Sequence, residues 1–328
     1  MATSRLSTAI DDGLLRLPEG PVTLIRPDPD PDFDIAPLPR DAIRIVHGFQ
    51  PICAAWEGAG FPVARKAAQC AVAIVSVPRS KGLAKALVAE ACAVADLVIV
   101  DGQRTDGVDS LFKSCRKVLG DLPSVTKAHG RIFWFPATDA FADWAAGPPQ
   151  KGAHGYFTAA GVFSDGEIDP GSAMLAEALP AKLPARMADL GAGWGYLAAP
   201  VLSREGVSSL DLVEAEALAL DCAQLNVTDP RVRFHWADAT AFAPQAPFDG
   251  IVMNPPFHTG RDATPELGRA FIRSAARMLT PQGKLWMVAN RHLPYEATLT
   301  ESFRNLDIIA QNGAFKVFHA TKPRQTRQ

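Results

Sequence analysis

Short apolar runs alternate with helix-like segments along this chain of 328 residues, and they do so in two separate series. Strands that alternate with helices predict an α/β fold with a doubly wound, mainly parallel sheet, because parallel strands need long crossover connections. The first series spans residues 71–135, and the second ends in a predicted antiparallel hairpin. Strand-like runs of the second series are Met187–Leu190, Ser209–Val213, Val232–Trp236, Gly250–Met253, Leu285–Ala289 and Phe315–Phe318. Helix-like segments between them are Gly195–Ser203, Ala215–Asn226 and Glu266–Leu279.

Length and a turn-rich segment divide the chain into two domains. A chain of 328 residues is longer than one hydrophobic core usually serves. Residues 141–155 contain the run Gly147-Pro148-Pro149-Gln150-Lys151-Gly152, which is typical of an interdomain connection. We therefore expect two Rossmann-like domains, at residues 1–150 and 151–328. Residues 18–40 are rich in proline and aspartate and predict an irregular loop.

The two series resemble copies of each other. Residues 72–135 and 248–318 both run from a strand through a turn and a helix to a final hairpin. Gly130 precedes Phe135 by five residues, the same spacing that separates Gly313 from Phe318. Where the second copy has the run Asn254-Pro255-Pro256-Phe257, the first copy has Val77-Pro78-Arg79-Ser80. The first copy also has no convincing glycine loop ahead of the strand that precedes this run. The alternative is that any two α/β domains share this rhythm.

Charge and cysteine content limit the function classes. The formal net charge is −2, so a surface for RNA has to be a local patch. The five cysteines form no C-x-x-C pair, which argues against a zinc site and fits a reducing cytoplasm. No apolar stretch approaches the ~20 residues of a membrane helix, and residues 1–5 lack the apolar core of a secretory signal. We expect a cytoplasmic protein without metal or membrane contact.

The run Asn254-Pro255-Pro256-Phe257 directly follows the apolar strand Gly250–Met253. Proline fixes φ and carries no N–H, so this turn is stiff and presents carbonyl groups. The Asn254 side-chain oxygen and the Pro255 carbonyl are suited to accept hydrogen bonds from an amino group that is conjugated with a ring or carbonyl. Phe257 offers a flat face on which a base can stack. The alternative is an ordinary strand terminator.

A second motif is the glycine loop Asp189-Leu190-Gly191-Ala192-Gly193-Trp194-Gly195, which follows an apolar strand and precedes a helix. Glycines allow tight turns and a close approach of a ligand to the backbone. The spacing differs from the dinucleotide fingerprint G-x-G-x-x-G. An acid ahead of the glycines suits a ligand with ammonium and sulfonium groups better than one with phosphates.

Polar residues also stand at the carboxyl ends of four successive predicted strands: Asp189, Glu214, Asp238 and Asn254. Ligands of open α/β sheets bind at this edge. A carboxylate at the Glu214 position can accept hydrogen bonds from ribose hydroxyls. An acceptor at Asp238 can accept hydrogen bonds from the amino group of an adenine. Any one of these acids alone is better explained as a solvated loop residue, but the ordered series favours a cofactor site.

With these motifs the chain resembles the class I S-adenosylmethionine-dependent methyltransferases. More narrowly, it resembles the bacterial ribosomal RNA guanine-N2 methyltransferases of the RsmC type, which act on small-subunit RNA. The matching blocks cover most of residues 155–320. They are Gly161-Val162-Phe163-Ser164, Asp169-Pro170-Gly171-Ser172, Asp189-Leu190-Gly191-Ala192-Gly193, Asn254-Pro255-Pro256-Phe257-His258-Thr259-Gly260, Ala289-Asn290-Arg291-His292-Leu293-Pro294-Tyr295 and Gly313-Ala314-Phe315-Lys316-Val317-Phe318. Departures are Glu214, where the family usually has Asp, and Asp238, where it often has Asn.

The resemblance implies methyl transfer from S-adenosylmethionine to the exocyclic N2 of a guanine in ribosomal RNA, after the base has left its stack. It implies catalytic roles for Asn254, Pro255, Pro256 and Phe257. Implied cofactor-binding residues are Asp189, Gly191, Gly193, Glu214, Asp238, Asn254 and Phe163, the last as a cover. The partner would be ribosomal RNA or a ribosomal subunit, and residues 1–150 would be a degenerate methyltransferase-like domain for RNA docking or structural support. We expect a monomer.

Two alternatives remain open from the residues alone. Related turns serve N6-adenine and glutamine-N5 methyltransferases, and a Tyr at the Phe257 position would have favoured those substrates. A non-catalytic RNA-binding or assembly factor is the third hypothesis. Loss of Asp189, the glycines or Asn254 would have supported it, and all of them are present.

Overall fold

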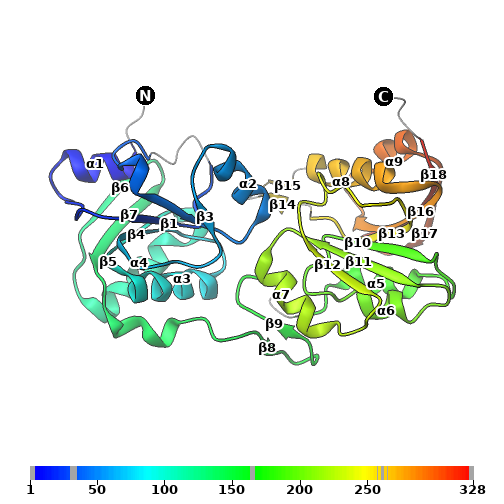
Figure 1. Cartoon of the computed structure of the whole chain (residues 1–328), viewed down its shortest axis with the longest axis horizontal. Helices are drawn as coiled ribbons and strands as arrows, with labels where there is room; N and C mark the ends of the chain where they lie inside the picture. The colour runs from blue at the N-terminus through cyan, green and yellow to red at the C-terminus, as the bar shows by residue number, and fades with distance from the viewer. Residues whose placement is uncertain are drawn as a thin grey trace. The chain divides into compact units, whose positions relative to one another are not determined.

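The computed structural model describes residues 4–29, 35–162, 167–256 and 265–324, together with the backbone of residues 258–259 and 262–263. The chain divides into two compact units, Met1–Pro148 and Pro149–Gln328 (Figure 1). Each unit has its own twisted sheet with helices on both faces. The expected α/β class with two tandem Rossmann-like domains is confirmed.

The sheet of the C-terminal unit has seven strands within the described residues, in the order β12-β11-β10-β13-β16-β18-β17. Neighbours from β12 to β16 pair in parallel, whereas β18 is antiparallel to both β16 and β17. The predicted C-terminal antiparallel hairpin is therefore confirmed. The bounds are β10 (Arg186–Leu190), β11 (Ser209–Glu214), β12 (Val232–Trp236), β13 (Phe248–Met253), β16 (Leu279–Asn290), β17 (Phe303–Gln311) and β18 (Phe315–Pro323).

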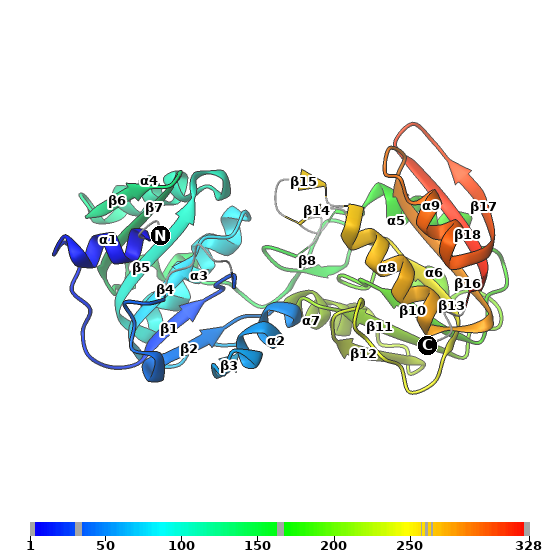
Figure 2. The same ribbon diagram turned by 90° about the horizontal axis from the view of Figure 1, so that it is seen from above.

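Helices cover both faces of this sheet because its central strands are apolar on both sides. On β13, Ile251 and Met253 belong to the core under α8 and α9, whereas Val252 belongs to the core under α5, α6 and α7. Figures 1 and 2 show α8 lying over one face of the sheet. The helices are α5 (Pro170–Ala178), α6 (Ala198–Leu202), α7 (Ala217–Asn226), α8 (Pro265–Met278) and α9 (Glu296–Ser302). Two small antiparallel pairs are β8 (Gln150–Lys151) with β9 (Phe157–Thr158), and β14 (His258–Thr259) with β15 (Asp262–Ala263).

The N-terminal unit repeats this topology. Its strand order is β3-β2-β1-β4-β5-β7-β6, which equals the C-terminal order when β1 is matched to β10. The strands are β1 (Val22–Ile25), β2 (Ile43–Val46), β3 (Val63–Ala64), β4 (Cys70–Ser76), β5 (Ala95–Gln103), β6 (Ser124–Lys127) and β7 (Gly130–Pro136). The helices are α1 (Arg5–Asp11), α2 (Gln50–Gly58), α3 (Lys81–Val94) and α4 (Val108–Leu119), with short 3-10 turns η1 (Arg40–Ala42), η2 (Arg104–Asp106) and η3 (Asp139–Trp144).

The structure corrects one expectation about the N-terminal half. The segment 18–40 is not only an irregular loop, because it contains β1, an interior strand of the first sheet. All four residues of β1 are buried between β2 and β4. Only four residues long and followed closely by prolines, β1 is too short for its periodicity to stand out in the sequence.

Strand register also corrects the expected alignment of the two copies. Ile25 pairs with Val46 and Val75, and Leu190 pairs with Val213 and Met253, so Ile25 matches Leu190. The residue after Val75 is Ser76 and the residue after Met253 is Asn254. Asn254 therefore matches Ser76 rather than Val77.

The final hairpins shift in the same way. Val100 on β5 takes the place of Met287 on β16, and their partners are Phe133 and Phe318. The equal five-residue spacing that starts at Gly130 and at Gly313 is a coincidence, because Phe318 matches Phe133 and not Phe135.

Two further searches concern the described residues only. None of their helices combines the length and the apolar character that a bilayer crossing requires. No group of three or more His, Cys, Asp or Glu side chains among them is arranged to hold a metal ion.

Candidate active site

Four adjacent parallel strands bring the expected site residues to one edge of the C-terminal sheet. Leu190 at the end of β10 pairs with Val213 of β11 and with Met253 of β13. Glu214 is the last residue of β11, and Asp238 follows the end of β12 by two residues. Parallel strands end at the same edge, so these groups and the turn after β13 lie together at the edge where open α/β sheets bind their ligands.

The glycine loop after β10 adopts left-handed backbone conformations. The φ angles of Gly191 and Gly193 are 73° and 56°, a region that side chains other than glycine rarely tolerate. The N–H groups of Gly191 and Ala192 donate to the Val213 carbonyl at 2.9 and 3.2 Å, which ties the loop to β11. A Cβ at Gly193 would have no heavy atom within 4 Å. The backbone at Gly193 is therefore open to a ligand.

Asp189 is the most unusual ionisable group of the site. Its side chain is 1% exposed, and neither carboxylate oxygen has a hydrogen-bond partner among the described residues. Burial raises the pKa of Asp189 to about 8, and the neighbouring Glu214 carboxylate acts in the same direction. A buried carboxyl without a partner is costly. It fits a ligand that brings a cationic donor such as an ammonium group.

Glu214 links the second strand to the glycine loop. Its Oε2 accepts from the Gly193 N–H at 2.8 Å and its Oε1 accepts from the Glu216 N–H at 2.8 Å. Burial raises the pKa of Glu214, and hydrogen bonds from the backbone of Glu216, Gly193 and Ala215 oppose that rise. Each carboxylate oxygen can accept more than one hydrogen bond. Glu214 therefore retains capacity for ligand hydroxyl groups, and its length lets it reach the loop.

Asp238 caps its own turn and keeps one oxygen available. Its Oδ1 accepts from the Thr240 N–H at 2.8 Å and from the Thr240 hydroxyl at 2.7 Å. Within the part of the chain that the structure describes, Oδ2 has no such donor. This oxygen can accept from an amine of a ligand bound at the strand ends.

The turn after β13 places Asn254 beside the start of α5. The Asn254 Nδ2 donates to Asp169 Oδ2 at 2.7 Å and to Ser172 Oγ at 2.9 Å. Pro255 is buried and Pro256 is exposed. Two further expected residues, the catalytic Phe257 and the cofactor cover Phe163, lie outside the described residues.

Sequence reasoning missed a clasp between β9 and the glycine loop. Asn226, at the end of α7, donates to the carbonyls of Phe157 and Trp194, both at 2.9 Å, and accepts from the Phe157 N–H at 2.6 Å. The Trp194 ring lies 4.7 Å from that of Tyr156 and 5.6 Å from that of Tyr196. Trp194 stands between two loop glycines, so this clasp holds the loop from outside. An Asn at a helix end is the only sequence signal for it.

The equivalent edge of the N-terminal unit lacks these groups. The Arg26 N–H donates to the Val46 carbonyl as the Gly191 N–H does to Val213, so Arg26 stands at the Gly191 position. Leu24 then replaces Asp189 and His47 replaces Glu214. His47 is buried, and burial together with the nearby Arg26 lowers its pKa to about 3. The acidic pair of the C-terminal unit has no counterpart at these positions.

Fold and site together define a class. A mainly parallel sheet with an antiparallel seventh strand, a glycine loop after β10, acids on the next strands and an Asn-Pro-Pro turn after β13 are the features of Rossmann-like methyltransferase domains.

Comparisons with known proteins agree with this class. A family model described as "Methyltransferase small domain" matches residues 155–319. The ribosomal RNA small subunit methyltransferase C of Shewanella halifaxensis is 31% identical over 263 residues, which are 76% of each chain. The protein of the same name from Hahella chejuensis is 31% identical over 248 residues, 72% of each chain. The chain therefore belongs to the methyltransferase small domain family and, within it, to the ribosomal RNA small subunit methyltransferases C, which confirms the resemblance and the expected enzyme class.

A solved structure extends the likeness to nearly the whole chain. The T. thermophilus 16S rRNA N2 G1207 methyltransferase RsmC, in complex with AdoMet and guanosine, aligns with a TM-score of 0.78. The alignment covers 94% of this chain and 90% of that chain at 24% identity, so it establishes the shared two-domain fold.

Proposed function

We propose that the C-terminal unit binds S-adenosylmethionine and that the chain methylates the exocyclic N2 of a guanine in small-subunit ribosomal RNA. The cofactor, when bound, supplies the methyl group from its sulfonium. Membership of the family supports ribosomal RNA as the substrate class. The observation that carries the reaction is Asn254, whose amide nitrogen donates to Asp169 and Ser172. Its oxygen has no donor among the described residues and would accept from a substrate amine.

The residues that would hold the cofactor fit its functional groups. The Asp189 carboxylate, which has no hydrogen-bond partner among the described residues, would accept from the ammonium group. The remaining lone pairs of Glu214 would accept from the ribose hydroxyls. Asp238 would accept from the adenine amine through its Oδ2. Gly191 and Gly193 would let the ligand approach the backbone, and Phe163 stays a proposed cover.

The substrate amine is a poor nucleophile, because its lone pair is delocalised into the base. The two N–H groups of the amine would donate hydrogen bonds to Asn254 Oδ1 and to the Pro255 carbonyl, and these bonds would orient its lone pair. Pro256 stiffens the turn, and Phe257 would stack on the extruded base. No strong base is needed, since the nitrogen becomes acidic only as the new bond forms. Alignment of the nitrogen with the methyl group would supply most of the rate.

The decisive assay is methyl transfer from labelled cofactor to 30S subunits, 50S subunits, free RNAs and DNA, followed by nucleoside analysis. N2-methylguanosine in small-subunit RNA is the expected product. N6-methyladenosine as the only product, or label confined to glutamine in protein, would assign a different substrate. Calorimetric titration with S-adenosylmethionine separates these enzymes from a non-catalytic assembly factor, for which no heat of binding is expected.

Replacement of Asn254 by alanine tests the turn. We expect Asn254→Ala to fold, to bind the cofactor almost as the wild type does, and to lose about 10²–10³-fold in kcat, the range for one preorganised polar group at a reacting centre. Asn305→Ala, which removes an exposed asparagine paired with Thr321 on the hairpin, is the matched control. Equal turnover of both variants would remove Asn254 from the mechanism.

We further propose that the N-terminal unit binds no cofactor and serves RNA docking or structural support. Leu24, Arg26 and His47 stand where a cofactor site would need an acid, a glycine and a second acid. The exposed cations Lys113 and Lys117 on α4 offer a local positive surface although the net charge of the chain is −2, whereas Arg116 on the same helix is paired with Asp121.

A further inference from the structure

We infer that Asp169 and Ser172 are positioning residues that fix the polarity of the Asn254 amide, so that its oxygen and not its nitrogen faces the substrate. This inference rests on the proposed function, in which Asn254 accepts a hydrogen bond from an amino group. The oxygen and nitrogen ends of an amide are nearly equal in shape and opposite in hydrogen bonding. A reversed Asn254 would present N–H donors to a substrate that is itself a donor. The turn alone does not choose between the two orientations.

Two neighbours make the choice. The Asn254 Nδ2 lies 2.7 Å from Asp169 Oδ2 and 2.9 Å from Ser172 Oγ, so both amide hydrogens have acceptors. In the reversed orientation the amide oxygen would lie against the Asp169 carboxylate, an acceptor facing an acceptor. The contact with a charged group is also stronger than one between neutral groups. Asp169 therefore sets the direction of the amide, and Ser172 holds its second hydrogen.

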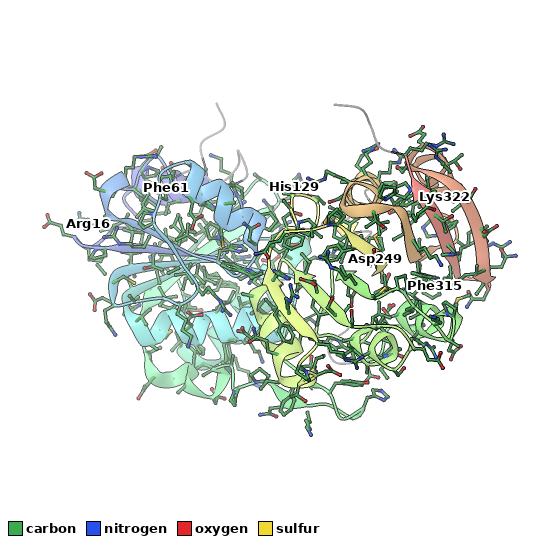
Figure 3. All side chains as sticks on the ribbon, turned by 45° about the vertical axis from the view of Figure 1, so that its right-hand side comes forward. Arg16, Phe61, His129, Asp249, Phe315 and Lys322 are labelled. Atoms are coloured by element: carbon green, nitrogen blue, oxygen red, sulfur yellow. The ribbon has the colours of Figure 1, made fainter. Side chains whose placement is uncertain are left out.

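Asp169 is itself held in place by α5. It is the N-cap residue of this helix, and its Oδ2 accepts from the Ser172 N–H at 2.8 Å. Pro170 follows at the first helical position, where its missing N–H costs nothing. A Cβ on Gly171 would lie 3.0 Å from Asp169 Oδ2 and 3.2 Å from the Phe315 ring, which is labelled in Figure 3. A side chain at this position would therefore force Asp169 or the Phe315 ring to shift by a few tenths of an ångström.

The helix shares a rigid core with the strand that carries the turn. Leu175 and Ala176 of α5 belong to the same buried cluster as Val252 of β13. The helix that carries Asp169 and Ser172 and the strand that carries the Asn254 turn are thus fixed to each other through this core. Asp169 and Asn254 are 85 residues apart in the chain, so the tertiary structure creates the contact.

The test separates the contact of Asp169 with Asn254 from its role as the helix cap. Asp169→Ser keeps a capping side chain but is too short to reach Asn254, whereas Asp169→Asn keeps an oxygen that can accept from both Ser172 and Asn254. We expect Asp169→Ser to lower kcat about 10²-fold, the cost of a misplaced reacting group, with an unchanged Kd for S-adenosylmethionine. Asp169→Asn should restore most of the rate, and Ser172→Ala should lose less than Asp169→Ser. Ser80→Ala, which removes the cap of α3, is the stability control and should leave kcat unchanged.

A double variant shows whether Asp169 acts through Asn254. Asp169→Ser combined with Asn254→Ala should be no slower than Asn254→Ala alone, because Asp169 then has no amide left to orient. The positioning role would be overturned if the fold losses in kcat of the two single variants multiplied in the double variant. It would also be overturned if Asp169→Ser kept the wild-type kcat. A wild-type protein that makes no N2-methylguanosine would overturn the proposed function instead, and wild-type turnover in Asn254→Ala would refute the role of the turn. These outcomes are therefore distinguishable.

Discussion

Asp189 shows at the scale of one residue how a binding site is maintained at a cost in stability. The folded protein keeps an ionisable group away from water with no hydrogen-bond partner among the described residues, beside the half-buried Glu214 carboxylate. Such a group is tolerated where a ligand later supplies the missing donor. The same property makes the protein without ligand sensitive to pH.

The sign of this sensitivity follows from the raised pKa. The ordinary value of 3.8 becomes about 8 in the folded protein, so between these limits the folded state binds more protons than the unfolded state. The free energy of unfolding therefore decreases as pH rises through this window, by up to ~1.4 kcal/mol per pH unit from one group. We expect Asp189→Asn to remove this contribution, so that the variant gains stability relative to the wild type from pH 5 to pH 8 while cofactor binding is lost. Urea unfolding of both proteins without ligand measures the difference, and parallel stability curves would contradict it.

Elements decide where the loops of the site are fixed. The glycine loop is held from inside by β11 through Val213 and Glu214, and from outside by α7 through Asn226. Strand β9 is bound to the same asparagine through the backbone of Phe157. An element outside the seven-stranded sheet is thus tied to the residue that holds the glycine loop.

The clasp of α7 can be tested by its effect on binding. Asn226→Ala removes three hydrogen bonds that hold Phe157 and Trp194, which together contribute about 1–3 kcal/mol. Part of this free energy orders the glycine loop, and part of it favours cofactor binding. We expect a Kd for S-adenosylmethionine about tenfold higher, with a smaller change in kcat at saturating cofactor. Leu225→Ala, at an exposed neighbouring position on α7, should leave the Kd unchanged. A larger loss in kcat than in affinity would mean that the clasp serves the reaction and not the cofactor.

At the scale of the whole molecule, the two units share one topology and differ at the edge where ligands bind. Register places Leu24, His47 and Ser76 of the N-terminal unit where the C-terminal unit has Asp189, Glu214 and Asn254. The repeated topology is what a duplication would leave. Under the proposed function, the C-terminal unit supplies the chemistry and the N-terminal unit serves a different role.

Charge reversal in the N-terminal unit tests that role. We expect Lys113→Glu with Lys117→Glu to weaken binding of small-subunit RNA and to lower the slope of log K against log salt by about 2, one per lost phosphate contact. Titration with S-adenosylmethionine should still give one site per chain with an unchanged Kd. Arg16→Glu, an exposed position outside α4, is the control for bulk charge. An equal loss in the control would show that α4 is not a docking surface.

The sequence predicted those features that depend on neighbours along the chain. The second α/β series, the glycine loop and the Asn-Pro-Pro turn are local patterns, because strand period, φ requirements and turn chemistry act over a few residues. The short strand β1 escaped detection, since its four residues are recognisable only from their burial between β2 and β4. The one-residue shift between Asn254 and Ser76 appeared only with strand register.

The sequence by itself determined the fold class, the order of acids at the strand ends and the family resemblance, all of which follow from the order of local signals. The tertiary structure alone decided which distant groups meet. It left Asp189 without a partner among the described residues, joined Asn226 to Trp194, and placed the cap of α5 against Asn254 across 85 residues. Hydrogen bonds and desolvation depend on distances between side chains in space, and spacing along the chain does not encode them.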